Sequence, residues 1–331
     1  GTSRCGCHQG RMRLRSIVLL TIILAMASCT KKQEAMPYVA NSIGQDSTAL
    51  QVAVLPTQSC LPVHYALRMG MFRQAGISVR LWRYQAQMDV DTSLIQGHVQ
   101  IAISDPFHAI RLPSDSLFIA PLMAMKEPLS LMALKGRRVK RIQQMKEKTV
   151  AVNRLSSSDY WCQRMTEDAK LDLSTIFRPQ VNDLYLRTDM LLNGFIDAVI
   201  LPEPYATWAA LEGHKRISVS KEEGVSNALW IVAQRQTIDK TLRAQAKTFA
   251  RVYEEAVRQM SEDVQADTIR AILKSEYRMP PLLADTIQLS PISAPYPLRA
   301  SDVETAAEWL RAQNRLPKNH DTKEFLLKQI K

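Results

Sequence analysis

Two acidic residues, each followed by proline, come directly after apolar runs that are typical of buried strands. Asp105-Pro106 follows the run VQIAIS, and Glu203-Pro204 follows the run IDAVIL. An acid ahead of proline is a good helix start, because its oxygens accept from free backbone N–H groups and proline has no N–H to leave unpaired. The same carboxylates could instead accept hydrogen bonds from an amine or an amino-heterocycle of a ligand. The sequence leaves both roles open.

Hydroxyl groups gather at other predicted loops. Thr57-Gln58-Ser59 follows the predicted strand Leu50–Leu55, and three serines begin a predicted helix over Ser156–Leu171. Free N–H groups and hydroxyls at a helix start suit an anion or a polar ring substituent. Ordinary capping, by Ser158 or Asp159, is the alternative. The candidate ligand-binding residues are Thr57, Gln58, Ser59, Ser104, Asp105, Ser156, Ser157, Ser158, Glu203 and Tyr205.

Aromatic residues lie beside the same loops. The pairs Tyr160-Trp161 and Tyr205-Trp208 could stack on a flat ligand, although helical spacing places one member of each pair in the core. No Cys/His cluster has the spacing of a metal site, and no cofactor is expected. No residue is assigned a catalytic role.

The elements that carry these residues occur twice. VAVLP begins at Val52 and VAVNR at Val150. The later segments LIQGHVQIAISDP and LLNGFIDAVILPEP contain Gly97 and Gly194, so strand and glycine are separated by 45 and 44 residues. We interpret this as a pseudo-repeat, with chance similarity between two βαβ units as the alternative.

Strands that alternate with helices predict an α/β fold with parallel sheets covered on both faces. In such sheets ligands bind beyond the carboxyl ends of the strands. Two lobes with those ends facing each other would form a cleft. The candidate residues would then line it from both sides.

These segments resemble the periplasmic substrate-binding proteins of ABC transporters, in the nitrate, sulfonate, taurine and thiamine-precursor (NMT1-like) branch. VAVLPTQSCLPVHYALRMGMFRQAGISVRLWRY resembles the opening of that family, and GFIDAVILPEPYATWA resembles its second-lobe segment. LIQGHVQIAISDP resembles a further motif, although Gln100 replaces the usual acid. The turn before the lobe-two helix, Arg154–Ser158, lacks the usual glycines. The resemblance covers Leu50 to Ala233, and none of its motifs is specific to a ligand.

The resemblance implies a bilobal type II periplasmic-binding-protein fold with two crossover segments. Lobe one is expected over residues 49–134 and 228–331, and lobe two over 135–227, with a linker over 29–48. The segment Leu129–Leu134 would lead into lobe two. It further implies a monomer that binds a small molecule and serves an ABC permease and ATPase, without catalysis.

Two helices are predicted in the last third of the chain. Asp239–Met260 carries one apolar stripe, which predicts a core-facing helix. Ser301-Asp302-Val303-Glu304 has the pattern of a capping box and predicts a helix that begins there.

The N-terminal segment has the pattern of a secretion signal. Arg11, Arg13 and Arg15 precede the short apolar run Ile17–Ala25, and small residues lead to Cys29. We interpret residues 1–28 as a signal peptide and Cys29 as the acylated residue of a bacterial lipoprotein. An uncleaved anchor and an ordinary signal peptide are the alternatives. The expected location is the periplasmic side of the cell envelope, anchored to a membrane by lipid.

The positive charge of the chain does not point to nucleic acid. The formal net charge is +11, but the dense basic run KGRRVKR has no accompanying nucleic-acid motif. It is interpreted as a solvated connection, with an anionic docking patch as the alternative. Beyond Cys29, only Cys60 and Cys162 remain, too few for a disulfide scaffold.

Three functions are compatible with this pattern. The first is a lipid-anchored solute-binding protein that closes on a small polar organic, sulfonate-like or heterocyclic ligand. The second is an enzyme of the same fold, of the pyrimidine-precursor or menaquinone-pathway type; the former would need a cysteine cluster and an active-site histidine, whereas the histidines here are scattered. The third is a ligand-sensing lipoprotein.

Overall fold

The computed structural model describes residues 1, 37–38, 48–221, 225–261 and 266–331. The predicted signal peptide and Cys29 lie outside these residues. Among the described residues, no helix is both long enough and apolar enough to cross a bilayer.

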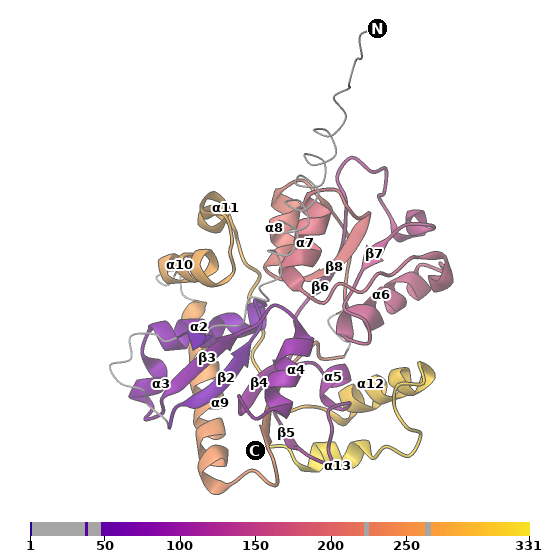
Figure 1. Cartoon of the computed structure of the whole chain (residues 1–331). Helices are drawn as coiled ribbons and strands as arrows, with labels where there is room; N and C mark the ends of the chain where they lie inside the picture. Colours follow the sequence, from indigo (N-terminus) through magenta and orange to yellow (C-terminus); the bar gives the residue numbers. More distant parts are fainter. Residues whose placement is uncertain (2–36, 39–47, 222–224, 262–265) are drawn as a thin grey trace. The chain divides into compact units, whose positions relative to one another are not determined.

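The described strands form two sheets, and each sheet is the centre of one lobe (Figure 1). The first sheet has the order β1 (Pro37–Tyr38), β3 (Val79–Arg83), β2 (Leu50–Val54), β4 (Ile101–Ser104), β10 (Ala228–Gln234), β5 (Phe118–Met125). The second has the order β7 (Val150–Ala151), β8 (Ala198–Pro202), β6 (Leu129–Ala133), β9 (Lys215–Val219). The prediction of a bilobal α/β fold is confirmed.

The pseudo-repeat is visible in the pairing. Strand β2 lies parallel to β3 and β4. Strand β7 lies parallel to β8, and parallel bridges join Thr149 to Phe177 and Val152 to Gln180 on its other side. In each lobe the first strand therefore has parallel neighbours on both sides, and one of them, β4 or β8, leads into the acid-proline pair.

Each unit is extended by a strand that arrives from the other lobe. Strand β10 follows lobe two and lies antiparallel to β4, and β6 follows lobe one and lies antiparallel to β8. The chain therefore crosses between the sheets at residues 126–128 and again between β9 and β10. Strand β6 belongs to the second sheet, although the sequence had assigned these residues to lobe one.

Helices cover the sheets, and short 3-10 turns join them. In lobe one they are η1 (Gln58–Cys60), α2 (Leu61–Arg68), α3 (Met71–Gln74), α4 (Gln87–Ile95), α5 (Pro106–Ala109), α9 (Lys240–Met260), α10 (Ala266–Glu276), α11 (Pro281–Thr286), α12 (Ala300–Ala312) and α13 (Thr322–Leu327). In lobe two they are η2 (Ile142–Met145), α6 (Ser157–Asp168), η3 (Leu173–Thr175), α7 (Leu184–Leu192) and α8 (Tyr205–Leu211).

Successive residues of β2 enter different layers of the core. Val52 and Val54 pack with residues of α2 and α9, whereas Ala53 packs with residues of α5 and α12 on the opposite face. This follows from the two-residue period of a strand. Because both faces are covered, β2 and β4 are mostly apolar rather than alternating, with Gln51 and Ser104 as their polar residues.

The two predicted C-terminal helices are present, but one begins differently. Helix α9 buries the predicted stripe, including Leu242, Phe249 and Tyr253. Helix α12 begins at Ala300 rather than at a Ser301 cap, so the capping-box prediction is wrong. The side chain of Asp302 is instead bound by Ser226 and Arg299.

Candidate functional site

The loops at the carboxyl ends of the parallel strands meet across the two lobes. The backbone N–H of Gln58, after β2, donates to the carbonyl of Glu203, after β8, at 2.8 Å. The backbone N–H of Ser157, after β7, donates to the carboxylate of Asp105, after β4, at 3.0 Å. Both sets of loop tips therefore face one another, which is the geometry that the repeat predicted.

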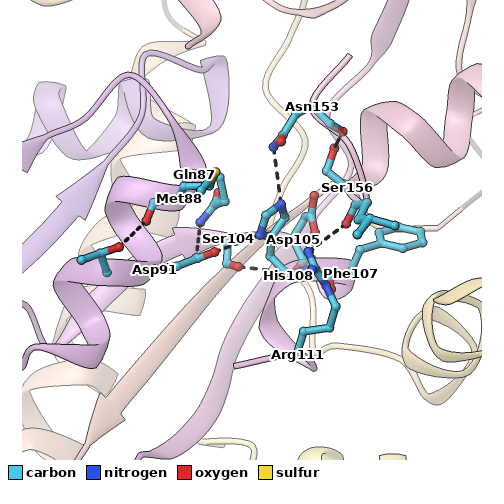
Figure 2. Close-up of polar contacts among 12 residues, drawn as sticks. Gln87, Met88, Asp91, Ser104, Asp105, Phe107, His108, Arg111, Asn153 and Ser156 are labelled. Atoms are coloured by element: carbon cyan, nitrogen blue, oxygen red, sulfur yellow. Dashed lines mark hydrogen bonds and ion pairs between the residues drawn. The ribbon is translucent and has the colours of Figure 1, made fainter. Parts of the chain in front are cut away.

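Asp105 is shared between its own helix and the opposite lobe (Figure 2). Its backbone is extended, and Oδ1 accepts from the N–H of His108 at 2.8 Å, which caps α5. Oδ2 accepts from both the N–H and the hydroxyl of Ser157 at 3.0 Å. A carboxylate at the start of α6 also meets the positive end of that helix dipole. Asp105 is thus a cap and a bridge between lobes.

Three more contacts surround this bridge. The side-chain amide nitrogen of Asn153 lies 3.4 Å from Nε2 of His108, and Nδ1 of the same ring lies 2.9 Å from the carboxylate of Asp91. The guanidinium of Arg111 donates to the carbonyl of Leu155 at 3.1 Å. We call Asp105, Ser157 and the five residues of these contacts the Asp105 cluster: Asp91, Asp105, His108, Arg111, Asn153, Leu155 and Ser157.

The other predicted serines act within lobe two. The hydroxyl of Ser156 accepts from the N–H of Ser158 at 3.1 Å and donates to the carbonyl of Asn153 at 2.7 Å. The hydroxyl of Ser158 accepts from the N–H of Asn153 at 3.0 Å. Ser156 is therefore the N-cap of α6, while Asp159, buried nearby, pairs with Arg154 at 3.2 Å.

Glu203 presents its backbone, not its carboxylate, to the other lobe. The carboxylate accepts from the N–H of Thr207 at 3.0 Å and from Arg216 at 3.1 Å. Its peptide bond to Pro204 is cis. The carboxylate of Glu203 therefore accepts a backbone N–H from the first turn of α8. The backbone carbonyl of the same residue accepts the N–H of Gln58.

A comparison with protein families matches residues 58–266, more than half of the chain, to the family described as NMT1/THI5 like. The chain belongs to the NMT1/THI5-like family. A comparison with curated proteins finds no match.

Solved structures share the fold of this NMT1/THI5-like protein. The nitrate-binding protein NrtA from Synechocystis PCC 6803 has a TM-score of 0.71 at 11% identity, covering 86% of each chain. The alkanesulfonate-binding protein SsuA from Xanthomonas axonopodis pv. citri, bound to MOPS, has a TM-score of 0.69 at 13% identity, covering 85% of this chain and 98% of that one. SsuA from Escherichia coli has a TM-score of 0.67 at 15% identity, covering 84% and 91%. These likenesses identify the periplasmic-binding-protein fold.

In this NMT1/THI5-like protein the first hydroxyl loop binds an acid that sequence reasoning missed. The N–H and hydroxyl of Ser59 donate to the buried carboxylate of Glu127 at 3.1 and 3.4 Å. Burial raises the pKa of Glu127 to about 7, against the hydrogen bonds from Ser59 and Gln58, which lower it. Glu127 lies between β5 and β6, at the first crossing between lobes. An acid between two apolar strands was the available signal.

Buried tyrosines hold the same loop. Tyr277 and Tyr253 donate their hydroxyls to the carbonyls of Thr57 and Ser59, each at 2.7 Å. The hydroxyl of Tyr205, in lobe two, donates to the carbonyl of Tyr277 at 3.0 Å. Burial raises the pKa of Tyr205, so this hydroxyl remains a donor at neutral pH. The loop is therefore fixed from both lobes.

The remaining predicted residues have local or packing contacts. The hydroxyl of Thr57 lies 2.9 Å from that of Ser59, and the hydroxyl of Ser104 donates to the carbonyl of Asp105 at 3.4 Å. Tyr205 stacks on Trp208, with ring centroids 5.6 Å apart. Tyr160 packs against Phe107 and Trp309 of lobe one.

The two described cysteines are buried free thiols. Desolvation raises the pKa of both Cys60 and Cys162 to about 12, so neither is a thiolate at neutral pH. Within the described part of the chain, no group of three or more His, Cys, Asp or Glu residues could hold a metal ion.

Proposed function

We propose that this protein is a solute-binding protein that closes its two lobes on a small polar organic or sulfonate-like ligand and delivers it to an ABC permease and ATPase. The observation that supports it most is the meeting of the carboxyl-end loops of both repeat units, in a chain of the NMT1/THI5-like family. Ligands of α/β sheets bind at such loops. Closure requires no chemical step, because a ligand that contacts both lobes shifts the population to the closed state.

The proposed ligand site is formed by the loops that the sequence singled out. These contain Thr57, Gln58, Ser59, Ser104, Asp105, Ser156, Ser157, Ser158, Glu203 and Tyr205. All ten are at most 9% exposed. Many of their polar groups already bind one another, so we propose that several of these residues shape and close the site, while groups without a partner contact the ligand.

Binding and closure can be tested on the full chain. Calorimetry against short sulfonates, amino acids, nitrate and aminopyrimidines should give at least one saturable ligand. Small-angle scattering should show a smaller radius of gyration with that ligand than without it. Binding without any change in radius would contradict closure, and the absence of binding to the whole panel would contradict the proposed solute class.

We also propose that Cys29 carries lipid and anchors a monomer on the periplasmic side of the envelope. The sequence around Cys29 supports this. Cells fed an alkyne fatty acid should label the wild-type chain and not Cys29→Ala. Equal labelling of both would contradict the anchor. Delivery is tested separately, by stimulation of the partner ATPase in the presence of the ligand found above.

A further inference from the structure

A densely positive loop follows β6 at one end of lobe two. Residues 135–148 contain seven lysines and arginines and one acid, Glu147. All of these bases are exposed except Lys148, which is half-buried. Among the described residues, the side chains of Arg138, Lys140 and Arg141 form no ion pair. Their charges are therefore available to an anionic partner outside the chain.

The order of the second sheet places this loop at the end away from lobe one. Strand β6 lies antiparallel to β8, so its last residue, Ala133, pairs with Ala198 at the start of β8. Ala133 also pairs with Lys215, at the start of β9. The loops that contact lobe one instead follow β7 and β8, at the opposite end of the same strands. The basic loop thus lies far from the proposed ligand site.

Large apolar side chains are exposed beside this loop. They are Phe177, which is 62% exposed, Phe195, which is 76% exposed, and Leu211, which is 54% exposed. The N–H of Phe177 donates to the carbonyl of Lys148, the last base of the loop, at 2.9 Å. Gly194, which precedes Phe195, lies against the side chain of Leu134, at the end of β6. Both phenylalanines therefore flank the basic loop.

The loop is fixed to its neighbours by side chains. The ammonium group of Lys135 donates to the carbonyl of Glu212, next to Leu211 in the chain, at 3.0 Å. The guanidinium of Arg137 lies 3.5 Å from the carboxylate of Asp197, just before β8. These contacts join the turns before β8 and β9 to the loop after β6. We call the exposed bases of residues 135–148, together with Phe177, Phe195 and Leu211, the distal basic surface.

This combination of side chains fits an anionic lipid bilayer. Lysine and arginine are attracted to anionic headgroups, and aromatic side chains lie favourably at the headgroup level. Leu211 can enter the same interface, whereas it has no aromatic face on which a nucleic-acid base could stack. The acids nearby do not cancel the charge, because Glu147 and Glu212 stand against seven bases and Asp197 is paired.

We propose that the distal basic surface docks on an anionic phospholipid bilayer. Arg138, Lys140 and Arg141 meet the headgroup phosphates. Phe177, Phe195 and Leu211 enter the interface beside them. Docking in this way places the ligand loops of lobe two on the side away from the bilayer. This inference goes beyond solute binding and does not depend on the identity of the solute.

Vesicle binding by the full chain tests the proposal. Partition coefficients are measured by sedimentation with vesicles of phosphatidylcholine alone, and with vesicles in which about a third of the lipid is phosphatidylglycerol. The wild type should prefer the anionic vesicles at about 0.1 M salt and lose most of that preference at about 0.5 M, because salt screens exposed charges. The combined variant Arg138→Gln, Lys140→Gln, Arg141→Gln should lower the preference about 30-fold or more, at about fivefold for each base.

A matched variant in lobe one removes the same charge elsewhere. The combined change Arg235→Gln, Lys240→Gln, Lys247→Gln also replaces three exposed bases and should alter the preference by no more than about twofold. All these chains share one N-terminal segment, so its contribution to partition cancels when variants are compared. The thermal midpoint of each should stay within about 1 °C of the wild type, because the replaced side chains are exposed.

A second pair of variants tests the apolar part of the surface. Phe195→Ser should weaken binding to the anionic vesicles about fivefold, because the ring no longer leaves water for the interface. Leu327→Ser, at a similarly exposed position of α13, should leave binding unchanged. Equal losses from these two changes would contradict the placement of Phe195 in the bilayer interface.

The remaining outcomes separate docking from net charge and from other polyanions. Equal losses in the two triple variants overturn the proposal, since attraction would then depend on total charge alone. An unchanged preference in the lobe-two triple variant overturns it as well. If that variant loses binding to soluble heparin but keeps its preference for anionic vesicles, the surface binds a soluble polyanion and the bilayer proposal is wrong. Calorimetry with a bound solute should give the same affinity in all variants, so failure of docking leaves solute binding intact.

Discussion

Two parts of the junction between the lobes differ in how their polar groups are satisfied. In the Asp105 cluster, the carboxylate accepts from His108 and Ser157, and His108 in turn binds Asn153 and Asp91. Around Arg187, two guanidinium nitrogens have no partner among the described residues. Buried polar groups in native proteins are normally paired. The first part is therefore complete as protein alone, whereas the second leaves buried donors unpaired among the described residues.

This comparison separates the polar groups that join the two lobes from those that stay unpaired. The serines and the acid that looked most like ligand contacts in the sequence mainly bind one another. Unpaired groups occur in Gln85, just after β3, in Arg187 of α7 and in Trp208 of α8. Gln85 and Arg187 were not singled out by any motif. Predictions that disturb each part in turn test this division.

The largest expected effect is at Asp105. Asp105→Ala leaves three buried donors without an acceptor, so the free energy of unfolding should fall by about 3–4 kcal/mol. Urea unfolding of the full chain measures it. Asp239→Ala, which removes the cap of α9 and an exposed bond from Gln234, should cost about 1 kcal/mol. Equal losses in the two variants would show that Asp105 is only a cap.

The next effect depends on pH and concerns Glu127. Its folded pKa of about 7 lies above its ordinary value of 4.5, so the folded chain retains a proton that the unfolded chain releases between these values. This contribution to stability is present below pH 4.5 and is lost as pH rises to 7. Glu127→Gln cannot ionise, so it should gain about 3 kcal/mol relative to wild type between pH 4.5 and pH 8.

Urea unfolding of the wild type and of Glu127→Gln, at pH 4.5 and at pH 8, measures this difference. Glu304→Gln, at an exposed position of α12, serves as the control and should follow the wild type at both. A gain for Glu127→Gln that is the same at pH 4.5 and pH 8 would contradict the shifted ionisation.

A smaller change tests the lobe-two side of the cluster. Ser157→Ala removes one hydroxyl bond to Asp105 and keeps the backbone bond, so it should cost about 1 kcal/mol. Combined with Asp105→Ala, it should add almost nothing, because the bond is already absent. Full additivity of the two losses would place Ser157 outside the cluster.

The smallest change is at the Arg187 side. Gln85→Met removes an oxygen that has no partner in the described structure, so the stability of the ligand-free chain should change by no more than about 0.5 kcal/mol. Urea unfolding of Gln85→Met and of Ser157→Ala, under the same conditions, measures the two stability changes. A loss larger than that of Ser157→Ala would mean that Gln85 is already satisfied, and would remove the contrast between the two parts.

The sequence by itself determined the repeated strand-and-helix unit and the position of each acid-proline pair. Short apolar runs that end at an acid are local features of the sequence. They are nearly continuous rather than alternating because each strand is covered on both faces. The start of α9 at Asp239 and the buried stripe that follows were predicted for the same reason. The segment containing Cys29 stays a prediction.

The tertiary structure alone decided which partner each polar group has. The carboxylate of Asp105 meets Ser157, 52 residues away, and Ser59 meets Glu127, 68 residues away. Such pairs depend on how two lobes approach, and no local pattern encodes that distance along the chain. Arg187 belongs to no motif in the sequence, and only its burial and the unpaired Nε and Nη1 among the described residues distinguish it.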